Sequence, residues 1–297
     1  MGHHHHHHDH SNGNIRTAFF LNFFFTIIEI IGGLLTNSMA ILSDALHDLG
    51  DSLSLGLAWF LEKYSKKGHD EKYSFGYRRF SLLAALINSV VLVIGSVFIL
   101  TEAVPRLLNP ESPNAAGMIL LAVLGIVVNG AAVVKMKDGE SMNAKVISWH
   151  LLEDVLGWVA VLIVSIVLFF VDLPILDPLL SIGITLYILY NVIMNLKKTM
   201  ELFLERVPDG IQLDDIKQRI EQIDNVLSIH HTHLWSLDGE HHAFSTHIIV
   251  PDHMQKDDVC TIKSQVNKII RDIHLDHVTI EIEYESEECS VNQVHHH

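Results

Sequence analysis

Residues 42–52 are LSDALHDLGDS and residues 149–158 are WHLLEDVLGW. Each stretch holds a histidine four residues before an aspartate, and these residues are His47, Asp51, His150 and Asp154. On a helix this spacing places the two side chains of a motif on one face, one turn apart. Both stretches lie in long apolar runs. An aspartate at the centre of a bilayer costs about 2.5–3.5 kcal/mol, so such a residue usually marks an ion path.

The two motifs together offer two imidazoles and two carboxylates. Such a set can form a four-coordinate N2O2 cage, which suits zinc. At ~1.5 Å per residue, His47 lies ~14 Å and Asp154 ~16 Å into their helices, so both reach the middle of a ~30 Å apolar layer. A purely structural His–Asp pairing is the simpler explanation for one motif. Two motifs at matching depth favour a shared metal site.

Six apolar segments have the length needed to cross a bilayer. They are roughly Ile15–Leu35, Met39–Tyr64, Arg79–Ala103, Ala116–Met136, Ala144–Val171 and Ile175–Leu196. Lysine and arginine concentrate in the second and fourth connections and after the sixth segment. By the positive-inside rule these connections and both termini are expected to face the cytoplasm.

From about residue 206 the pattern becomes that of a soluble domain. Helical periodicity over Ile211–Ile223 and Asp257–Ile273 alternates with expected strands at Val226–Leu237, His241–Val250 and Val278–Tyr284. The order α-β-β-α-β predicts a small ferredoxin-like α+β sheet covered by two helices. The expected domains are therefore a membrane domain over 15–205 and a cytoplasmic metal-binding domain over 206–290. A His-rich tail or purification tag over 1–14 and a tail over 291–297 flank them.

The chain has 297 residues, of which 49% are hydrophobic, and its formal net charge is −15. This acidic balance argues against a nucleic-acid partner and is compatible with attracting cations. The only two cysteines, Cys260 and Cys289, form no CxxC motif, which fits a soluble part in a reducing compartment.

The same residues carry a resemblance to a known family. LTNSMAILSDALHDLGDS, SFGYRRF, WHLLEDVLGW, LDPLLS, HLWSLDG and TIEIE all resemble the cation diffusion facilitator family, in its zinc-transporting branch. The resemblance runs from about residue 14 to 286. It implies a homodimer, formed through the cytoplasmic and transmembrane regions, that exchanges zinc for protons by alternating access.

The resemblance also implies roles for particular residues. His47, Asp51, His150 and Asp154 correspond to the transport site of the family. In the soluble domain, His233, His247 and Glu283 match positions that bind zinc in relatives, and Glu281 falls where some relatives have histidine. Zinc is the expected ion, with cadmium or cobalt as possible substitutes, because all three accept tetrahedral N/O sites.

Four further charged residues are candidates for the path or for a hinge. Asp44 lies three residues before His47 and can line the path or orient a ligand. Asp177 can cap the sixth helix or act directly, and capping is favoured. Arg79 and Glu205 can form a hinge pair or a plain surface ion pair.

Two other function classes compete with transport. An intramembrane metalloenzyme would keep an open metal position and a general base, and no HExxH motif occurs. A membrane-anchored metal sensor would need fewer spans. We therefore predict a non-enzymatic, multi-pass exporter of zinc in a lipid bilayer, expected to be a bacterial inner membrane, with protons as counter-ions.

Overall fold

The computed structural model describes residues 9–65, 69–136, 142–271, 273 and 275–287. The chain divides into two units, which are described separately. The first, here called the helical bundle, comprises Met1–Tyr64 and Leu83–Leu196. The second, here called the sheet unit, comprises Ser65–Leu82 and Lys197–His297.

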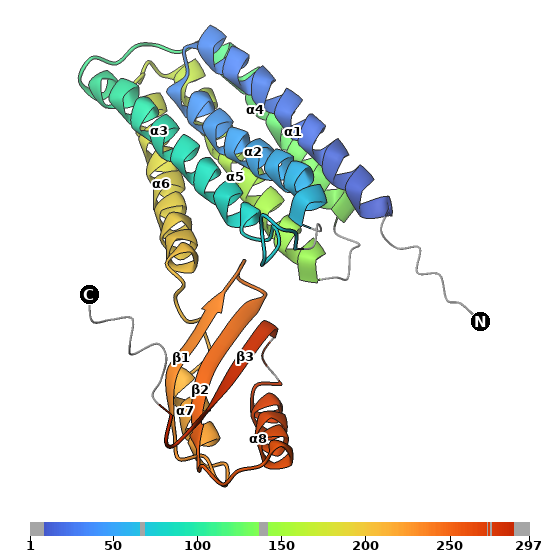
Figure 1. Ribbon diagram of the computed structural model, residues 1–297. Helices are drawn as coiled ribbons and strands as arrows, with labels where there is room; N and C mark the ends of the chain where they lie inside the picture. The colour runs from blue at the N-terminus through green and yellow to red at the C-terminus, as the bar shows by residue number, and fades with distance from the viewer. Residues whose placement is uncertain (1–8, 66–68, 137–141, 272, 274, 288–297) are drawn as a thin grey trace. The chain divides into compact units, whose positions relative to one another are not determined.

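All six predicted apolar segments are helices, and Figure 1 shows them side by side. They are α1 (Asp9–Thr36), α2 (Met39–Ser65), α3 (Phe80–Leu108), α4 (Ala115–Met136), α5 (Met142–Phe170) and α6 (Leu176–Phe203). Helices suit a bilayer because each satisfies its own backbone hydrogen bonds.

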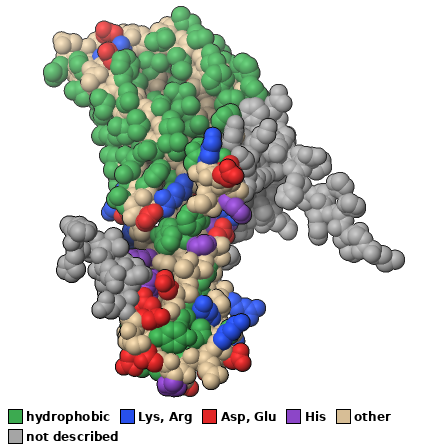
Figure 2. Space-filling view, viewed as in Figure 1, with side chains coloured by type: hydrophobic (Ala, Val, Ile, Leu, Met, Phe, Trp, Pro, Cys, Tyr) green, Lys and Arg blue, Asp and Glu red, His purple; other side chains and the backbone are tan. Residues whose placement is uncertain are grey.

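Among the described residues, four helices are long and apolar enough to cross a membrane: α1, α3, α5 and α6. Helix α4 contributes a shorter apolar run, Ala115–Ala131. Helix α2 has the length, but its buried acidic residues lower its hydropathy. Hydrophobic side chains cover the face of the bundle seen in Figure 2. This is the surface expected of a multi-pass membrane protein.

The bundle interior is packed around Trp158 of α5, which is 1% exposed. Its indole meets the ring of Phe25 from α1 edge to face, with the ring centroids 6.0 Å apart. A Cβ at Gly125 of α4 would come within 2.2 Å of the Trp158 ring. Only glycine therefore lets α4 approach α5 at this level.

The sheet unit has the predicted α-β-β-α-β order. Its elements are α7 (Leu213–Glu221), β1 (Ser228–Ser236), β2 (His242–Val250), α8 (Lys256–Ile269) and β3 (Leu275–Tyr284). Strand β2 is central, antiparallel to β1 and parallel to β3. The parallel pair requires a crossover, and α8 supplies it. The predicted fold class is confirmed.

The two faces of this sheet differ in chemistry. One face is apolar: Phe244 and Ile248 of β2 pack with Ile220 of α7 and Val266 of α8 in one core cluster. Side chains alternate along a strand, so His247 of β2 points to the opposite face, beside its β3 register partner Glu281. The polar face of the sheet therefore collects histidines and glutamates.

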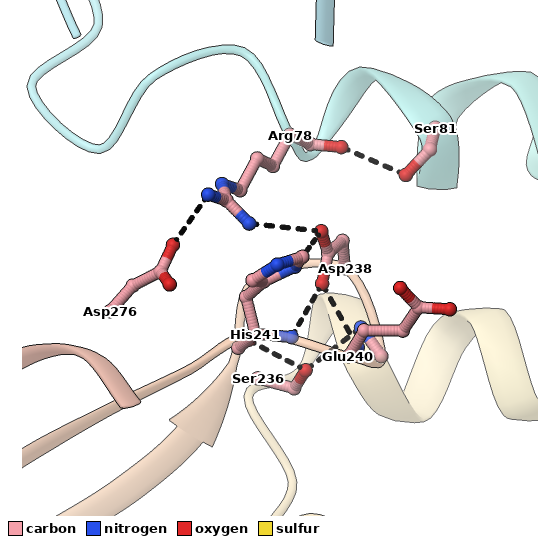
Figure 3. Close-up of polar contacts among 8 residues, drawn as sticks. Arg78, Ser81, Ser236, Asp238, Glu240, His241 and Asp276 are labelled. Carbon is pink, nitrogen blue, oxygen red and sulfur yellow. Dashed lines mark hydrogen bonds and ion pairs between the residues drawn. The ribbon is translucent and has the colours of Figure 1, made fainter. Parts of the chain in front are cut away.

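The connection before α3 groups with the sheet unit in the structure. The guanidinium of Arg78 lies 2.8 Å from the Asp276 carboxylate and 3.9 Å from that of Asp238 (Figure 3). The ring of Phe75 also meets the rings of Trp235 and His277 edge to face. These contacts explain the grouping.

Candidate metal centres

The first metal centre lies in the helical bundle. Nε2 of His47 is 3.9 Å from Oδ2 of Asp51 and 3.6 Å from Oδ1 of Asp154. One ligand atom from each of the three residues lies within 4.8 Å of the others, a spacing that one metal ion can bridge. The structure thus brings α2 and α5 together at the two predicted motifs.

The fourth predicted ligand, His150, lies in α5, but its side chain is outside the described residues. Its helical position is one turn before Asp154. Residues four apart share a helix face, so its backbone position is compatible with the same centre.

Three more carboxyl groups lie buried near this centre. Asp44 and Asp48 of α2 are 5% and 4% exposed. Glu29 of α1 is 1% exposed, and its carboxyl group faces that of Asp48. Among the described residues, no N–H or hydroxyl group donates to either oxygen of Glu29. The sequence interpretation missed Glu29, although it is the only acidic residue in the apolar run of α1 and could have been found by that signal.

Asp177 acts as a cap, but for a different helix from the one predicted. Its Oδ2 accepts a hydrogen bond from the Met39 N–H at 2.7 Å, and its Oδ1 accepts from the Ser38 hydroxyl at 2.6 Å and the Ala40 N–H at 3.3 Å. Met39 begins α2, so the carboxylate satisfies the free N–H groups of that helix. Asp177 itself lies in the first turn of α6. It therefore ties the starts of α2 and α6 together at one end of the bundle.

The second metal centre lies on the polar face of the sheet unit. Nδ1 of His247 is 2.7 Å from Oε1 of Glu283, and Nε2 of His230 is 3.1 Å from Oε2 of the same residue. Nε2 of His247 lies 3.6 Å from Oε2 of Glu281. The rings of His230, His231 and His247 are mutually 5.0–5.3 Å apart. His230, His247 and Glu283 place ligand atoms within 4.8 Å of one another.

His230 occupies the place that the sequence interpretation gave to His233. The ladder pairs His230 with His247 but His233 with Ser245, so β1 has one extra residue between them. This bulge includes His231, whose φ is +46°. An unbroken strand would turn His230 away from His233; the bulge resets the alternation and puts His230 opposite His247. His233 is exposed and does not belong to the described ligand group.

Arg79 and Glu205 form the predicted ion pair, with an N–O distance of 2.8 Å. Their side chains are 39% and 55% exposed, so solvent screens the pair and its contribution to stability is small. Both residues belong to the sheet unit.

Residues 15–204 match the cation efflux transmembrane domain, and residues 208–285 match the cation efflux protein cytoplasmic domain. The chain belongs to the cation efflux family. The predicted resemblance to the cation diffusion facilitators is thereby confirmed.

Named members of the cation efflux family are similar over nearly their whole length. The cadmium, cobalt and zinc/H(+)-K(+) antiporter of Bacillus subtilis is 34% identical, over 88% of this chain and 86% of the relative. The metal cation efflux system protein CzcD of Cupriavidus metallidurans is 31% identical, over 95% and 90%. Zinc transporter ZitB of Escherichia coli is 29% identical, over 92% and 90%. Their names describe transporters and not enzymes, in agreement with the sequence prediction.

Proposed function

We propose that this protein exports zinc from the cytoplasm in exchange for protons, through a His2Asp2 site at the middle of the membrane. The observation that carries the proposal is the approach of His47 and Asp51 on α2 to Asp154 on α5 inside an apolar bundle. His150 supplies the fourth ligand by its helical spacing. Imidazole nitrogen and carboxylate oxygen are zinc ligands, and cadmium and cobalt accept similar sites.

Proton exchange follows from the chemistry of these ligands. A histidine or carboxylate must lose its proton before it binds a metal, so protons and zinc compete for the same atoms. Entry of protons from the outer side then helps to release zinc outward. The name of the Bacillus subtilis relative includes both zinc and H(+), which supports proton exchange in this proposal.

The sheet unit provides a regulatory metal site in this proposal. His230, His247 and Glu283 bind cytosolic zinc, with Glu281 at the edge of the site. The match of residues 208–285 to a dimerisation domain of the family supports a homodimer. In this proposal the termini face the cytoplasm, because lysine and arginine concentrate in the connections on that side. The compact loops favour a bacterial inner membrane as the location of the bundle.

Transport into proteoliposomes tests the proposal. Vesicles hold a zinc-sensitive dye, and uptake is measured with and without a pH gradient for the wild type and for Asp154→Ala. Asp172→Asn, a change of an exposed aspartate between α5 and α6, is the matched control. We expect gradient-driven uptake by the wild type and the control and none by Asp154→Ala. Wild-type uptake that ignores the gradient would refute the exchange mechanism. Transport by Asp154→Ala at the wild-type rate would refute the membrane site.

A further inference from the structure

A cavity of about 660 Å³, open on one side, lies in the helical bundle and is bordered by α2, α5 and α6. His47 and Asp154 form part of its wall, so it leads directly to the membrane metal centre. Along α6 the wall runs from Leu176, the first residue of the helix, to Ile188. At 1.5 Å per residue this is ~18 Å, about half the thickness of a bilayer core. The cavity therefore joins the metal centre to the end of the bundle where Asp177 ties α2 to α6.

One carboxylate borders this cavity between the metal centre and that end. Asp44 lies on α2, one turn nearer the start of the helix than His47, and is 5% exposed. Its charged surroundings are other carboxylates and His47. A buried carboxylate among other carboxylates is costly, and a cation that passes through the cavity can offset that cost.

Gly157 of α5 lies directly beside this carboxylate. A Cβ added at Gly157 would lie 3.3 Å from Oδ1 of Asp44, closer than carbon and oxygen comfortably approach. Gly157 also borders the cavity. The absence of a side chain at Gly157 thus avoids a tight contact with the Asp44 carboxylate.

We propose that Asp44 is a second contact for the cation, on the route between the membrane metal centre and the outer end of the bundle, and that Gly157 leaves its Oδ1 free of the contact that a side chain at that position would make. The proposal rests on the proposed function. Apart from Glu153 and Tyr187, the remaining wall outside the metal centre is apolar, as at Leu179 and Ile184, and offers no ligand oxygen from its side chains. A carboxylate at this point replaces water ligands as the ion leaves the His–Asp centre, so it lowers the barrier to exit without being needed for binding.

The test combines a rate and a binding measurement on the full-length protein. Initial zinc flux is recorded by stopped-flow in proteoliposomes, and zinc bound per chain is measured by equilibrium dialysis in detergent. The variants are Asp44→Asn, Gly157→Ala and Asp51→Ala. Gly130→Ala is the matched control, because a Cβ at Gly130 of α4 meets nothing within 4 Å and Gly130 is outside the cavity.

We expect Asp44→Asn and Gly157→Ala each to slow zinc flux roughly tenfold, which corresponds to about 1.4 kcal/mol on the barrier. The amount of zinc bound per chain should stay at the wild-type value in both, and Gly130→Ala should transport normally. Wild-type flux in Asp44→Asn would overturn the inference. Loss of a bound zinc in Asp44→Asn would overturn it too, because Asp44 would then be a ligand of the metal centre itself.

Asp51→Ala separates this inference from the proposed function. If Asp51→Ala transports and binds zinc normally, the proposed membrane site is wrong. If it loses transport and one bound zinc per chain while Asp44→Asn behaves as wild type, only the role of Asp44 is wrong. Gel filtration checks folding, and if Gly157→Ala does not fold, the isosteric Asp44→Asn variant alone decides.

Discussion

At the scale of single residues, the extra residue in β1 decides which histidine faces the second metal centre. His230 lies opposite His247 in the ladder and 3.1 Å from Glu283. His233, three residues further along, lies opposite Ser245 and is exposed. The two histidines have the same chemistry and lie on the same strand. Any difference between their roles must therefore come from their positions in the β1–β2 ladder.

Alanine substitution of His230 tests this assignment, and the same substitution of His233 is the control. Replacing His230 with alanine removes a ligand, so zinc affinity at the sheet unit should fall at least roughly 100-fold, the upper end of the effect seen for outer-shell partners of metal ligands. His233→Ala should leave the affinity within about twofold, as a solvent-exposed change usually does. Isothermal titration of the full-length protein in the Asp51→Ala background isolates this centre. Equal losses in the two variants would show that His233 is also a ligand.

At the scale of elements, the turn between β1 and β2 is organised by Asp238. Its carboxylate accepts hydrogen bonds from the N–H groups of Glu240 and His241 at 3.0 and 2.8 Å, and it contacts the His241 ring at 2.8 Å (Figure 3). Partial burial acts to raise the pKa of Asp238, but the hydrogen bonds from His241 and Glu240 outweigh it and hold the pKa below its ordinary value of 3.8. The charged form is thus the one that the turn stabilises.

The sign of the pH dependence follows from that lowered pKa. The stabilisation by Asp238 is fully present above the ordinary pKa of 3.8 and is lost as the pH falls through the lower folded-state pKa. Asp238→Asn should therefore lower the free energy of unfolding of the sheet unit by about 1 kcal/mol at pH 7, a value reduced for solvent screening. At pH 3 and below, the difference from the wild type should shrink.

Urea unfolding of the full-length protein in detergent, followed by tryptophan fluorescence, measures this difference at both pH values. Asp224→Asn, at an exposed aspartate before β1, is the control and should change little at either pH. A constant difference between Asp238→Asn and the wild type from pH 7 to pH 3 would contradict the role of the charge.

At the scale of the whole molecule, the sequence predicted what periodicity and hydropathy encode. The six helices and the α-β-β-α-β order follow from local patterns. The pairing of the motifs at His47 and Asp154 is predicted from their matching depth in two helices of the apolar layer. The bulge at His231, the capping of α2 by Asp177 and the contact of Glu29 with Asp48 depend on which elements become neighbours. The spacing of residues within one segment carries no information about such contacts. The grouping of the connection before α3 with the sheet unit also depends on contacts between segments that are distant in the sequence.

The two metal centres also differ in what each can contribute to the assembly. In the proposed transport cycle the bundle centre must release its ion each time, whereas the centre of the sheet unit can keep its ion. A ligand that binds the folded form at 100 times its Kd stabilises that form by about 2.7 kcal/mol. If zinc at His230, His247 and Glu283 favours the dimer, the same linkage makes dimerisation depend on zinc.

Sedimentation of the full-length protein in detergent tests this dependence. Zinc should shift the wild type toward the dimer relative to EDTA, and His247→Ala should lose that shift because it removes the residue that contacts both Glu281 and Glu283. Asp51→Ala, which alters only the bundle centre, should keep the shift. Since the transport ligands are intact in His247→Ala, its maximal zinc flux should persist while the zinc concentration for half-maximal flux rises. A zinc-dependent shift that survives in His247→Ala but disappears in Asp51→Ala would assign the control of assembly to the membrane site instead.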